Sequence, residues 1–235
     1  MFINHKLIKM KKLFISIIFI TTFSVSAQTS ARFYNMNVKS GHAESVLNIF
    51  NDFNEGAKWK PGSGVMLQRV MFKNDVTHRI ITWGDPENWG STTQKTSAEW
   101  RAYLEKMNNH RDPSVDSAIV TSYGFTDGDI EGNPTAKVFD IHIHEPAKFK
   151  AAFDILVKQN QSIIGNRRMG LIQYDAGGTP GATHGIVVYG KNINDLVIIE
   201  RRFRDSEGFS DYLKNRGKVE YKLNYIVNTL SRSSN

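Results

Sequence analysis

The chain has 235 residues, no cysteine and a formal net charge of +7 at pH 7, and 40% of its residues are hydrophobic. The absence of cysteine excludes a disulfide framework, a thiolate metal site and a cysteine nucleophile, while the length allows a sizeable core to be buried without cross-links. The positive charge is mild and dispersed. Its small clusters, Arg167-Arg168 and Arg201-Arg202, are interpreted as solvated faces or local ion pairs, so no nucleic-acid partner is expected.

The N-terminus has the pattern of a secretory signal peptide. A lysine-rich stretch at 6–12 precedes an apolar run at 13–23, and small residues follow as far as Ala27. This order is typical of export, and the run is too short to span a bilayer. We therefore expect a periplasmic or secreted protein that begins at Gln28, has lost four lysines and carries a net charge of +3. An uncleaved anchor is the alternative, and Met10 is a second candidate start.

A long internal repeat comes next. Residues 77–84 read Thr-His-Arg-Ile-Ile-Thr-Trp-Gly, and residues 183–190 read Thr-His-Gly-Ile-Val-Val-Tyr-Gly. A Ser-x-x-aromatic-x-x-Tyr-Leu block occurs at 97–104 and again at 206–213. Because both blocks recur in the same order, the chain is interpreted as one unit written twice. The offset drifts from 106 to 109 residues, which places insertions in loops.

The first copy predicts six elements in the order strand, helix, strand, strand, helix, strand. Alternation of apolar and polar residues predicts a strand at 32–39, and apolar residues at helical spacing predict a helix at 44–53. Two strands are then expected at 65–72 and 78–83. The Ser-x-x-aromatic block predicts the second helix, and a last strand is expected near 117–123.

The second copy repeats this order. Its expected elements are a strand at 137–144, a helix with apolar residues from 149 to 156, strands at 170–174 and 185–189, a helical block at 206–213 and a strand near 220–227. Gly128 to Thr135 contains glycine and proline and predicts a linker. We therefore expect a signal peptide over residues 1–27 and two repeats over residues 28–130 and 131–235.

This element order is the split βαβ, or ferredoxin-like, arrangement. Its antiparallel sheet has helices on one face and leaves the other bare, so a second sheet is needed as a cover. On this order and duplication, the chain resembles the dimeric α/β-barrel superfamily, which includes antibiotic-biosynthesis-monooxygenase-like and NIPSNAP-like groups, over nearly all of residues 31–230. The resemblance implies an α+β fold in which two tandem repeats pack sheet to sheet as a pseudo-dimeric barrel, with a ligand held between the sheets.

The strand at 137–144 suggests where such a ligand would bind. If its apolar residues face the helices, its polar residues face the barrel interior, because side chains alternate along a strand. The polar residues are Asp140, His142 and His144, and Asn35 and Asn37 stand at the places of the first two in copy one. These five are predicted to line the cavity. Polar alternation on a half-exposed sheet is the other interpretation.

The same residues raise the question of a metal. Two histidines and a carboxylate can ligate iron or another divalent ion. However, Asp140, His142 and His144 span about 13 Å along a straight strand, which is too far for all three to reach one ion. A metal would need further ligands such as His78 or His184, and these recur simply because the unit is duplicated. We therefore predict no metal site.

Tryptophans and a glycine-rich run supply the remaining candidates. Trp59 and Trp89 lie in loop segments of copy one only and are predicted to stack on a flat ligand, whereas Trp83 and Trp100 belong to repeated blocks and are expected in the core. The run at 177–181 lacks the lysine and the following helix of a phosphate loop, so it is predicted to be a hairpin tip.

Two classes of function remain open. The first is an exported protein that binds a small molecule in the cavity between the halves. The second is an enzyme in that cavity: a monooxygenase, cofactor-free or haem-linked, or an isomerase that acts on a small aromatic or polyketide-like molecule. No Gly-x-Ser-x-Gly elbow is present to indicate a serine hydrolase. The sequence identifies no cofactor and leaves enzymatic activity and oligomeric state open.

Overall fold

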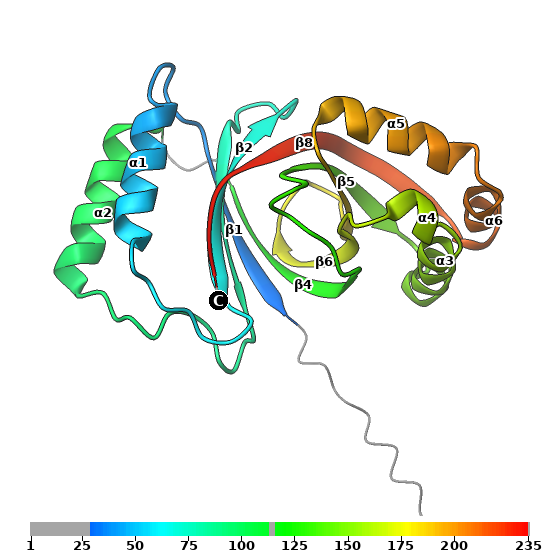
Figure 1. Cartoon of the computed structure of the whole chain (residues 1–235), viewed down its shortest axis with the longest axis horizontal. Helices are drawn as coiled ribbons and strands as arrows, with labels where there is room; N and C mark the ends of the chain where they lie inside the picture. Colours follow the sequence, from blue (N-terminus) through cyan, green and yellow to red (C-terminus); the bar gives the residue numbers. More distant parts are fainter. Residues whose placement is uncertain (1–28, 113–115, 235) are drawn as a thin grey trace, which may run out of the picture.

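The computed structural model describes residues 29–112 and 116–234 (Figure 1). These residues form two successive units, each built from four strands and at least two helices. The predicted signal peptide, residues 1–27, lies outside the described residues. Within the described ranges, every helix is too short or too polar to cross a bilayer.

The first repeat follows the predicted element order. Its elements are β1 (Ser30–Met36), α1 (Ala43–Asn54), β2 (Gly64–Met71), β3 (His78–Gly84), α2 (Ser97–Asn109) and β4 (Ser117–Phe125). A capping box fixes the start of α2, because Thr96 Oγ1 accepts a hydrogen bond from the Glu99 amide and the Glu99 carboxylate accepts one from the Thr96 amide.

The second repeat has the same order with extra helices. Its elements are β5 (Thr135–Ile143), α3 (Pro146–Gln159), α4 (Gln161–Ile164), β6 (Met169–Gly177), β7 (His184–Gly190), α5 (Ile193–Arg204), α6 (Glu207–Asn215) and β8 (Val219–Ser234). Sequence analysis expected one helical block here and missed α5. The helix begins after Asn192, whose side chain caps the Asp195 amide, and it buries Leu196, Ile199 and Phe203 on one stripe.

The eight strands form one closed antiparallel barrel. Their order is β1-β3-β2-β8-β5-β7-β6-β4, and β4 pairs with β1 to close the ring. Each repeat contributes four adjacent strands, and the repeats join at the β2–β8 and β4–β6 seams. β8 is 16 residues long, because its first part pairs with β5 and its last part with β2. Figure 1 shows this long strand crossing from one repeat to the other. The predicted pseudo-dimeric barrel is confirmed.

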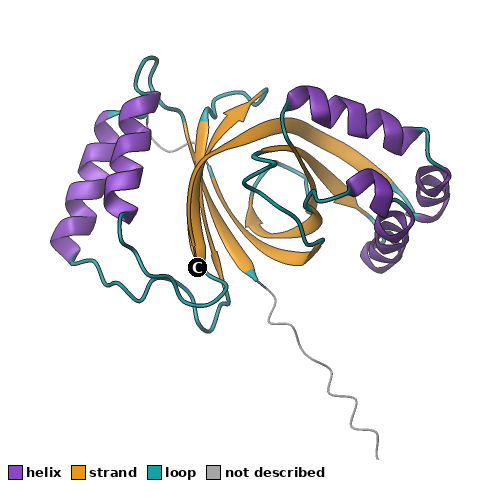
Figure 2. Cartoon of the chain, viewed as in Figure 1, coloured by secondary structure: helices purple, strands orange, loops and turns teal. Residues whose placement is uncertain are grey.

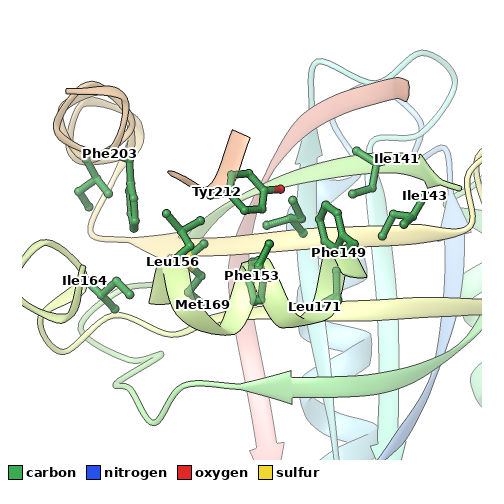
Figure 3. Packing of buried hydrophobic residues seen from close by; sticks show 13 residues of the cluster. Ile141, Ile143, Phe149, Phe153, Leu156, Ile164, Met169, Leu171, Phe203 and Tyr212 are labelled. Atoms are coloured by element: carbon green, nitrogen blue, oxygen red, sulfur yellow. The ribbon is translucent and has the colours of Figure 1, made fainter. Parts of the chain in front are cut away.

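Helices cover the outside of the barrel on two opposite sides, α1 and α2 on one side and α3, α5 and α6 on the other (Figure 2). In the second repeat, Ile141 and Ile143 pack with Phe149 and Leu171 in a buried cluster beneath these helices (Figure 3). The predicted direction of the apolar residues of β5 is therefore correct. Asp140, which directly precedes Ile141, is fully buried on the opposite face, inside the barrel.

The duplicated Thr-His pair has the same structural task in both repeats. Thr77 Oγ1 accepts a hydrogen bond from the Val38 amide at 2.8 Å and lies 3.0 Å from Nδ1 of His78. In the second repeat, Thr183 Oγ1 accepts from a β5 amide at 3.0 Å and lies 2.9 Å from Nδ1 of His184. Each threonine thus ties the start of one strand to the end of its neighbour. This contact gives the recurrence of the two histidines a structural explanation.

Candidate functional site

Two cavities lie on opposite faces of the sheet. The first, called the helix pocket, lies between the outer face of the second repeat's strands and helices α3, α5 and α6, and its volume is about 300 Å³. Its lining is predominantly apolar. It consists of Phe139, Phe153, Leu156, Met169, Ile186, Val188, Leu196, Ile199, Phe203, Phe209, Tyr212 and Tyr221, together with the charged residues Lys137, Glu200 and Arg204.

The helix pocket has space because the second repeat carries smaller side chains at two corresponding positions. Leu156 takes the place of Phe53, and Phe209 takes the place of Trp100. In the first repeat, the Phe53 ring stacks on Tyr103 with centroids 4.1 Å apart and meets the edge of Trp100 at 4.7 Å. Tyr103 is buried and Phe53 is partly buried against the first repeat's core, whereas Trp100 is 48% exposed. Leu156 has no ring to stack in this way, and a pocket lies beside it.

Charged groups of the helix pocket carry mainly positive charge. Lys137 Nζ is 2.7 Å from Glu200 Oε2, and the same ammonium lies 4.8 Å from the Phe139 ring. Arg204 makes no ion pair with any residue in the described part of the chain. Burial raises the pKa of Tyr212, so its hydroxyl stays protonated at neutral pH. The lining therefore combines an apolar body with one paired and one unpaired cation.

The second cavity, called the barrel cavity, lies inside the barrel at the end where β1 begins and β3 ends. Its volume is about 140 Å³. Its lining consists of Thr29, Ala31, Phe33, Met66, Arg79, Ile81, Trp83, Val120, Ser122, Phe125, Ile130, Arg168, Ile172, Val187, Tyr189 and Arg232. The linker between the repeats lies against this end, because Ile130 is part of the lining and the Asp129 amide donates to the Asn166 carbonyl.

Deeper in the barrel, Arg79 is buried, and it forms no ion pair with a carboxylate in residues 29–112 or 116–234. Its Nε donates to Gln68 Oε1 at 2.8 Å, and its Nη1 donates to the Tyr225 hydroxyl at 3.1 Å. Its guanidinium also lies 4.7 Å from the centroid of the Phe33 ring. Every one of these partners is neutral. Burial raises the pKa of Tyr225 to about 12, so this hydroxyl is not a base at neutral pH.

Asp140, a predicted ligand-binding residue, is instead fully engaged by the protein itself. Tyr174 Oη donates to its Oδ1 at 2.6 Å, and Thr179 Oγ1 donates to its Oδ2 at 2.5 Å. Thr179 belongs to the β6–β7 connection, so this hydrogen bond ties the predicted hairpin tip to the barrel. Burial, together with the nearby Tyr225 and Asp140, raises the pKa of Tyr174 well above its ordinary value. Asp140 therefore lies inside the barrel as predicted, but it lines neither cavity.

Asn35 and Asn37 also differ from their predicted role. Asn35 is buried, and its amide donates to the Asp116 carboxylate. Asn37 Nδ2 donates to Asp112 Oδ2 at 2.9 Å. Both amides thus fasten the end of β1 to the segment between α2 and β4. Neither lines the helix pocket or the barrel cavity.

His142 and His144 lie on one side of β5, as the spacing predicts, with ring centroids 4.6 Å apart. However, they sit at the barrel's end rather than in its interior. His142 Nδ1 is 3.2 Å from the Gly181 carbonyl oxygen, and His144 Nε2 is 2.8 Å from the Glu220 carboxylate. The physical reason is that β5 ends at residue 143 and its register with β8 shifts after residue 140. Within the described ranges, no three metal-ligating side chains converge.

The two loop tryptophans contact other segments of the protein, Trp59 the end of β8 and Trp89 the start of β1. Trp59 Nε1 donates to Ser233 Oγ at 2.7 Å, and the Trp89 ring lies 4.8 Å from the Arg32 guanidinium. Neither residue lines a cavity. None of the seven predicted binding residues is therefore part of either lining, because their polar groups bond to neighbouring protein segments or lie at the barrel's end.

Sequence analysis missed Arg168. It interpreted the pair Arg167-Arg168 as solvated or locally paired, and this holds for Arg167, whose guanidinium bonds Asp195 at 2.8 and 3.1 Å. Arg168 turns the other way, lies 4.7 Å from the Phe125 ring and lines the barrel cavity. Adjacent residues at the start of a strand point to opposite faces, so alternation was the available signal.

Comparison with known proteins gives a match in structure alone. No family model and no curated protein matches the chain. A protein of Fusobacterium nucleatum provisionally assigned as a monooxygenase matches with a TM-score of 0.60 and 15% identity, over 88% of this chain and 95% of that chain. The chain has the dimeric α/β-barrel fold. A provisionally assigned monooxygenase of Lactobacillus acidophilus gives 0.56 and 9% over 87% and 94%, and an anthrone oxidase-like protein gives 0.51 and 9% over 89% and 94%.

Proposed function

We propose that the protein is an exported small-molecule-binding protein and that it holds a predominantly apolar ligand in the helix pocket. The observation that carries this proposal is the 300 Å³ cavity itself, whose lining is almost entirely aliphatic and aromatic. Ligand sites are concave, mainly apolar and about 300–1,000 Å³ in volume. An unfilled apolar space of this size also leaves its walls without the contacts that a packed core provides.

This proposal moves the ligand from the predicted place between the halves to the outside of the barrel. The barrel cavity has less than half the volume of the helix pocket. In addition, Asp140, Tyr174 and Thr179 fill much of the opposite end of the interior with bonded polar groups. The helix pocket has no such network and is the better container for an apolar molecule.

The residues of the helix pocket favour binding over catalysis. Its lining has no histidine and no cysteine, and its one carboxylate, Glu200, is paired with Lys137. A haem group needs an axial ligand such as histidine, cysteine, methionine or tyrosine. Met169, Tyr212 and Tyr221 are the lining residues of those types, and Tyr212 is held protonated. The histidine-ligated haem of a haem-linked oxygenase does not fit this lining.

A monooxygenase or an isomerase that acts on a small aromatic or polyketide-like molecule is the alternative. The provisional assignments of the two bacterial proteins and the description of the anthrone oxidase-like protein support it. An absorbance spectrum of the purified protein separates the classes, since haem and flavin absorb visible light. Native mass spectrometry would reveal a retained ligand. A visible chromophore at one equivalent per chain would favour the enzyme.

Export rests on the N-terminal sequence pattern at residues 1–27. The test is cell fractionation followed by N-terminal sequencing of the mature protein. We expect a chain that begins at Gln28 and lies outside the inner membrane. An intact N-terminus in the cytoplasmic fraction would contradict export and leave the pocket proposal unaffected.

The helix pocket is tested by placing larger side chains in its lining, as at the corresponding position of the first repeat. Leu156→Phe restores the residue type of Phe53 at the corresponding position. The neutral fluorophore N-phenyl-1-naphthylamine should bind the wild-type protein, and the Leu156→Phe variant should bind it at least 10-fold more weakly. Val188→Phe, on β7 in the same lining, should have the same effect and guards against a folding artefact.

The matched control is Leu104→Phe, because it makes the same change at an exposed position of α2. This variant should bind the fluorophore like the wild type, and all variants should keep a cooperative thermal melt. Unchanged fluorophore binding in both pocket variants would rule out the helix pocket as the site.

A further inference from the structure

We propose that the barrel cavity is a second binding site, independent of the helix pocket, and that it takes a small aromatic carboxylate whose carboxylate group is held by Arg168 and Arg232. The proposal concerns residues that no part of the proposed function uses. It rests on the positive charge of the lining, the contacts of its arginines with aromatic rings and the predominance of apolar residues in its walls.

The lining of the cavity is positively charged. Arg79, Arg168 and Arg232 are in its lining, and the lining contains no acidic residue. None of the three makes an ion pair with a carboxylate in residues 29–112 or 116–234. Arg79 is buried, Arg168 is half-buried and Arg232 is exposed, and a charge becomes costly as it is buried unless a partner neutralises it. An anionic ligand would supply that partner.

All three guanidinium groups lie over aromatic rings, and Arg79 lies over Phe33. Arg168 lies 4.7 Å from the centroid of Phe125, and Arg232 lies 5.4 Å from that of Trp83. Stacking holds a guanidinium flat and leaves its N–H edge free to bind a carboxylate with two hydrogen bonds. Burial and the nearby Arg232 together hold the pKa of Arg168 below its ordinary value, although Tyr189 and Asp127 act against them. Because both residues line the same cavity, an anion bound there would face two cations.

The walls favour an organic anion over a hydrated inorganic one. Phe33, Trp83, Phe125 and Tyr189 contribute rings, and most other lining residues are aliphatic. The volume of 140 Å³ corresponds to a few water molecules at about 30 Å³ each, which is room for a single substituted ring. Inorganic phosphate would lose its hydration shell against these apolar walls. A benzoate-like ligand places its ring on them and its charge at the arginines.

The test is isothermal titration of the mature chain with benzoate, and with benzamide as its uncharged counterpart of the same shape. Benzoate should bind with one site per chain, and benzamide should bind at least 10-fold more weakly. Arg168→Gln and Arg232→Gln should each weaken benzoate binding at least 10-fold. Arg232 is exposed, so its substitution leaves the core intact even if the Arg168 variant folds poorly.

Two controls fix the location. Arg101→Gln removes the same charge from an exposed position of α2 and should leave benzoate binding unchanged. Leu156→Phe should also leave it unchanged while it abolishes fluorophore binding, so failure of one site is distinguishable from failure of the other. The proposal is overturned if benzoate does not bind, if Arg232→Gln binds it normally, if benzamide or inorganic phosphate binds as tightly, or if Leu156→Phe removes benzoate binding.

Discussion

The two repeats share a fold but differ in the space beneath their helices. Between β3 and α2, the first repeat has an irregular connection at 85–96, whereas the second repeat has helix α5 at the corresponding place. The first repeat stacks Phe53 among aromatic rings, and the second has Leu156 there and a cavity. In a duplicated fold, a binding site can therefore be present in one copy only, because one connecting segment and the volumes of a few side chains differ between the copies.

The comparison also separates scaffold from site. Features that both repeats keep, such as the threonine–histidine contacts at His78 and His184, tie strands together and need no ligand to explain them. Features present in one repeat only, above all α5 and Leu156, surround the helix pocket. Within a duplicated chain, asymmetry is thus a better guide to function than recurrence.

The largest expected effect comes from separating the repeats. Residues 28–130 or 131–235 expressed alone should be insoluble or should dimerise, because each half then has unpaired edges at the β2–β8 and β4–β6 seams and exposes a sheet face that the barrel buries. Size-exclusion chromatography with light scattering measures the outcome. A stable, monodisperse monomer of either half would show that the repeats do not depend on each other.

The next effect concerns the two faces of β5. Ile141→Ala should lower the free energy of unfolding by about 2–5 kcal/mol, because Ile141 is fully buried beneath the helices and its truncation leaves a cavity. His142→Ala, one residue further along the chain, should change stability by about 0.5 kcal/mol or less, since surface substitutions usually do. Urea denaturation of both variants compares them. The reverse ranking would show that the faces of β5 are assigned wrongly.

The free energy of unfolding is also expected to depend on pH, because His78 is buried. Burial, and secondarily the charge of Arg69, lowers its pKa from 6.5 to about 4 in the folded protein. Between these values the unfolded chain binds a proton that the folded chain does not, so stability falls as the pH drops from 6.5 toward 4 and is unaffected above 6.5. The loss should approach roughly 2–3 kcal/mol.

This pH effect is measured by urea unfolding at pH 7 and pH 4.5. His78→Gln should show a smaller loss between the two pH values than the wild type. Burial also lowers the pKa of His184 in the second repeat, so part of the loss should remain in that variant. Leu104→Phe, at an exposed position of α2, changes no titratable group; it is the control and should show the same pH dependence as the wild type. An identical slope in His78→Gln and wild type would contradict the assignment.

The smallest effect comes from making the first repeat resemble the second. Phe53→Leu removes the stack on Tyr103 and the edge contact with Trp100 and should cost about 1–2 kcal/mol, since aromatic pairs contribute about 0.5–1.5 kcal/mol each. If ring volume alone explains the difference between the repeats, this variant should gain a weak second site for N-phenyl-1-naphthylamine. A single site with unchanged affinity would mean that α5 is required as well.

Local patterns in the sequence were sufficient for much of this fold. Alternation along β5 correctly placed Ile141 beneath the helices, and the duplication correctly predicted a pseudo-dimeric barrel. The expectation that Trp100 lies in the core was only partly right, since it packs on Phe53 but is 48% exposed. Helix α5 was missed because its apolar stripe is short and a helical block was already assigned nearby.

The candidate sites could not be derived in the same way. Periodicity tells which side of a strand a residue faces, and it correctly put Asp140 in the barrel. It does not tell which polar groups will bond to each other, and Tyr174 and Thr179 come from distant segments to occupy that carboxylate. Likewise, Arg168 and Arg232 line one cavity only because the start of β6 and the end of β8 lie at the same end of the barrel.

The sequence by itself determined the repeated unit, the order of its elements and the apolar face of each strand, because these depend on the spacing of residues close together in the chain. Tertiary structure alone decided where empty space and unpaired charge remain. The size of a cavity such as the helix pocket depends on the combined volumes of side chains from β5, α3, α5 and α6. Whether a charge is paired depends on every residue that surrounds it. Both quantities depend on contacts between residues far apart in the chain, which no local pattern records.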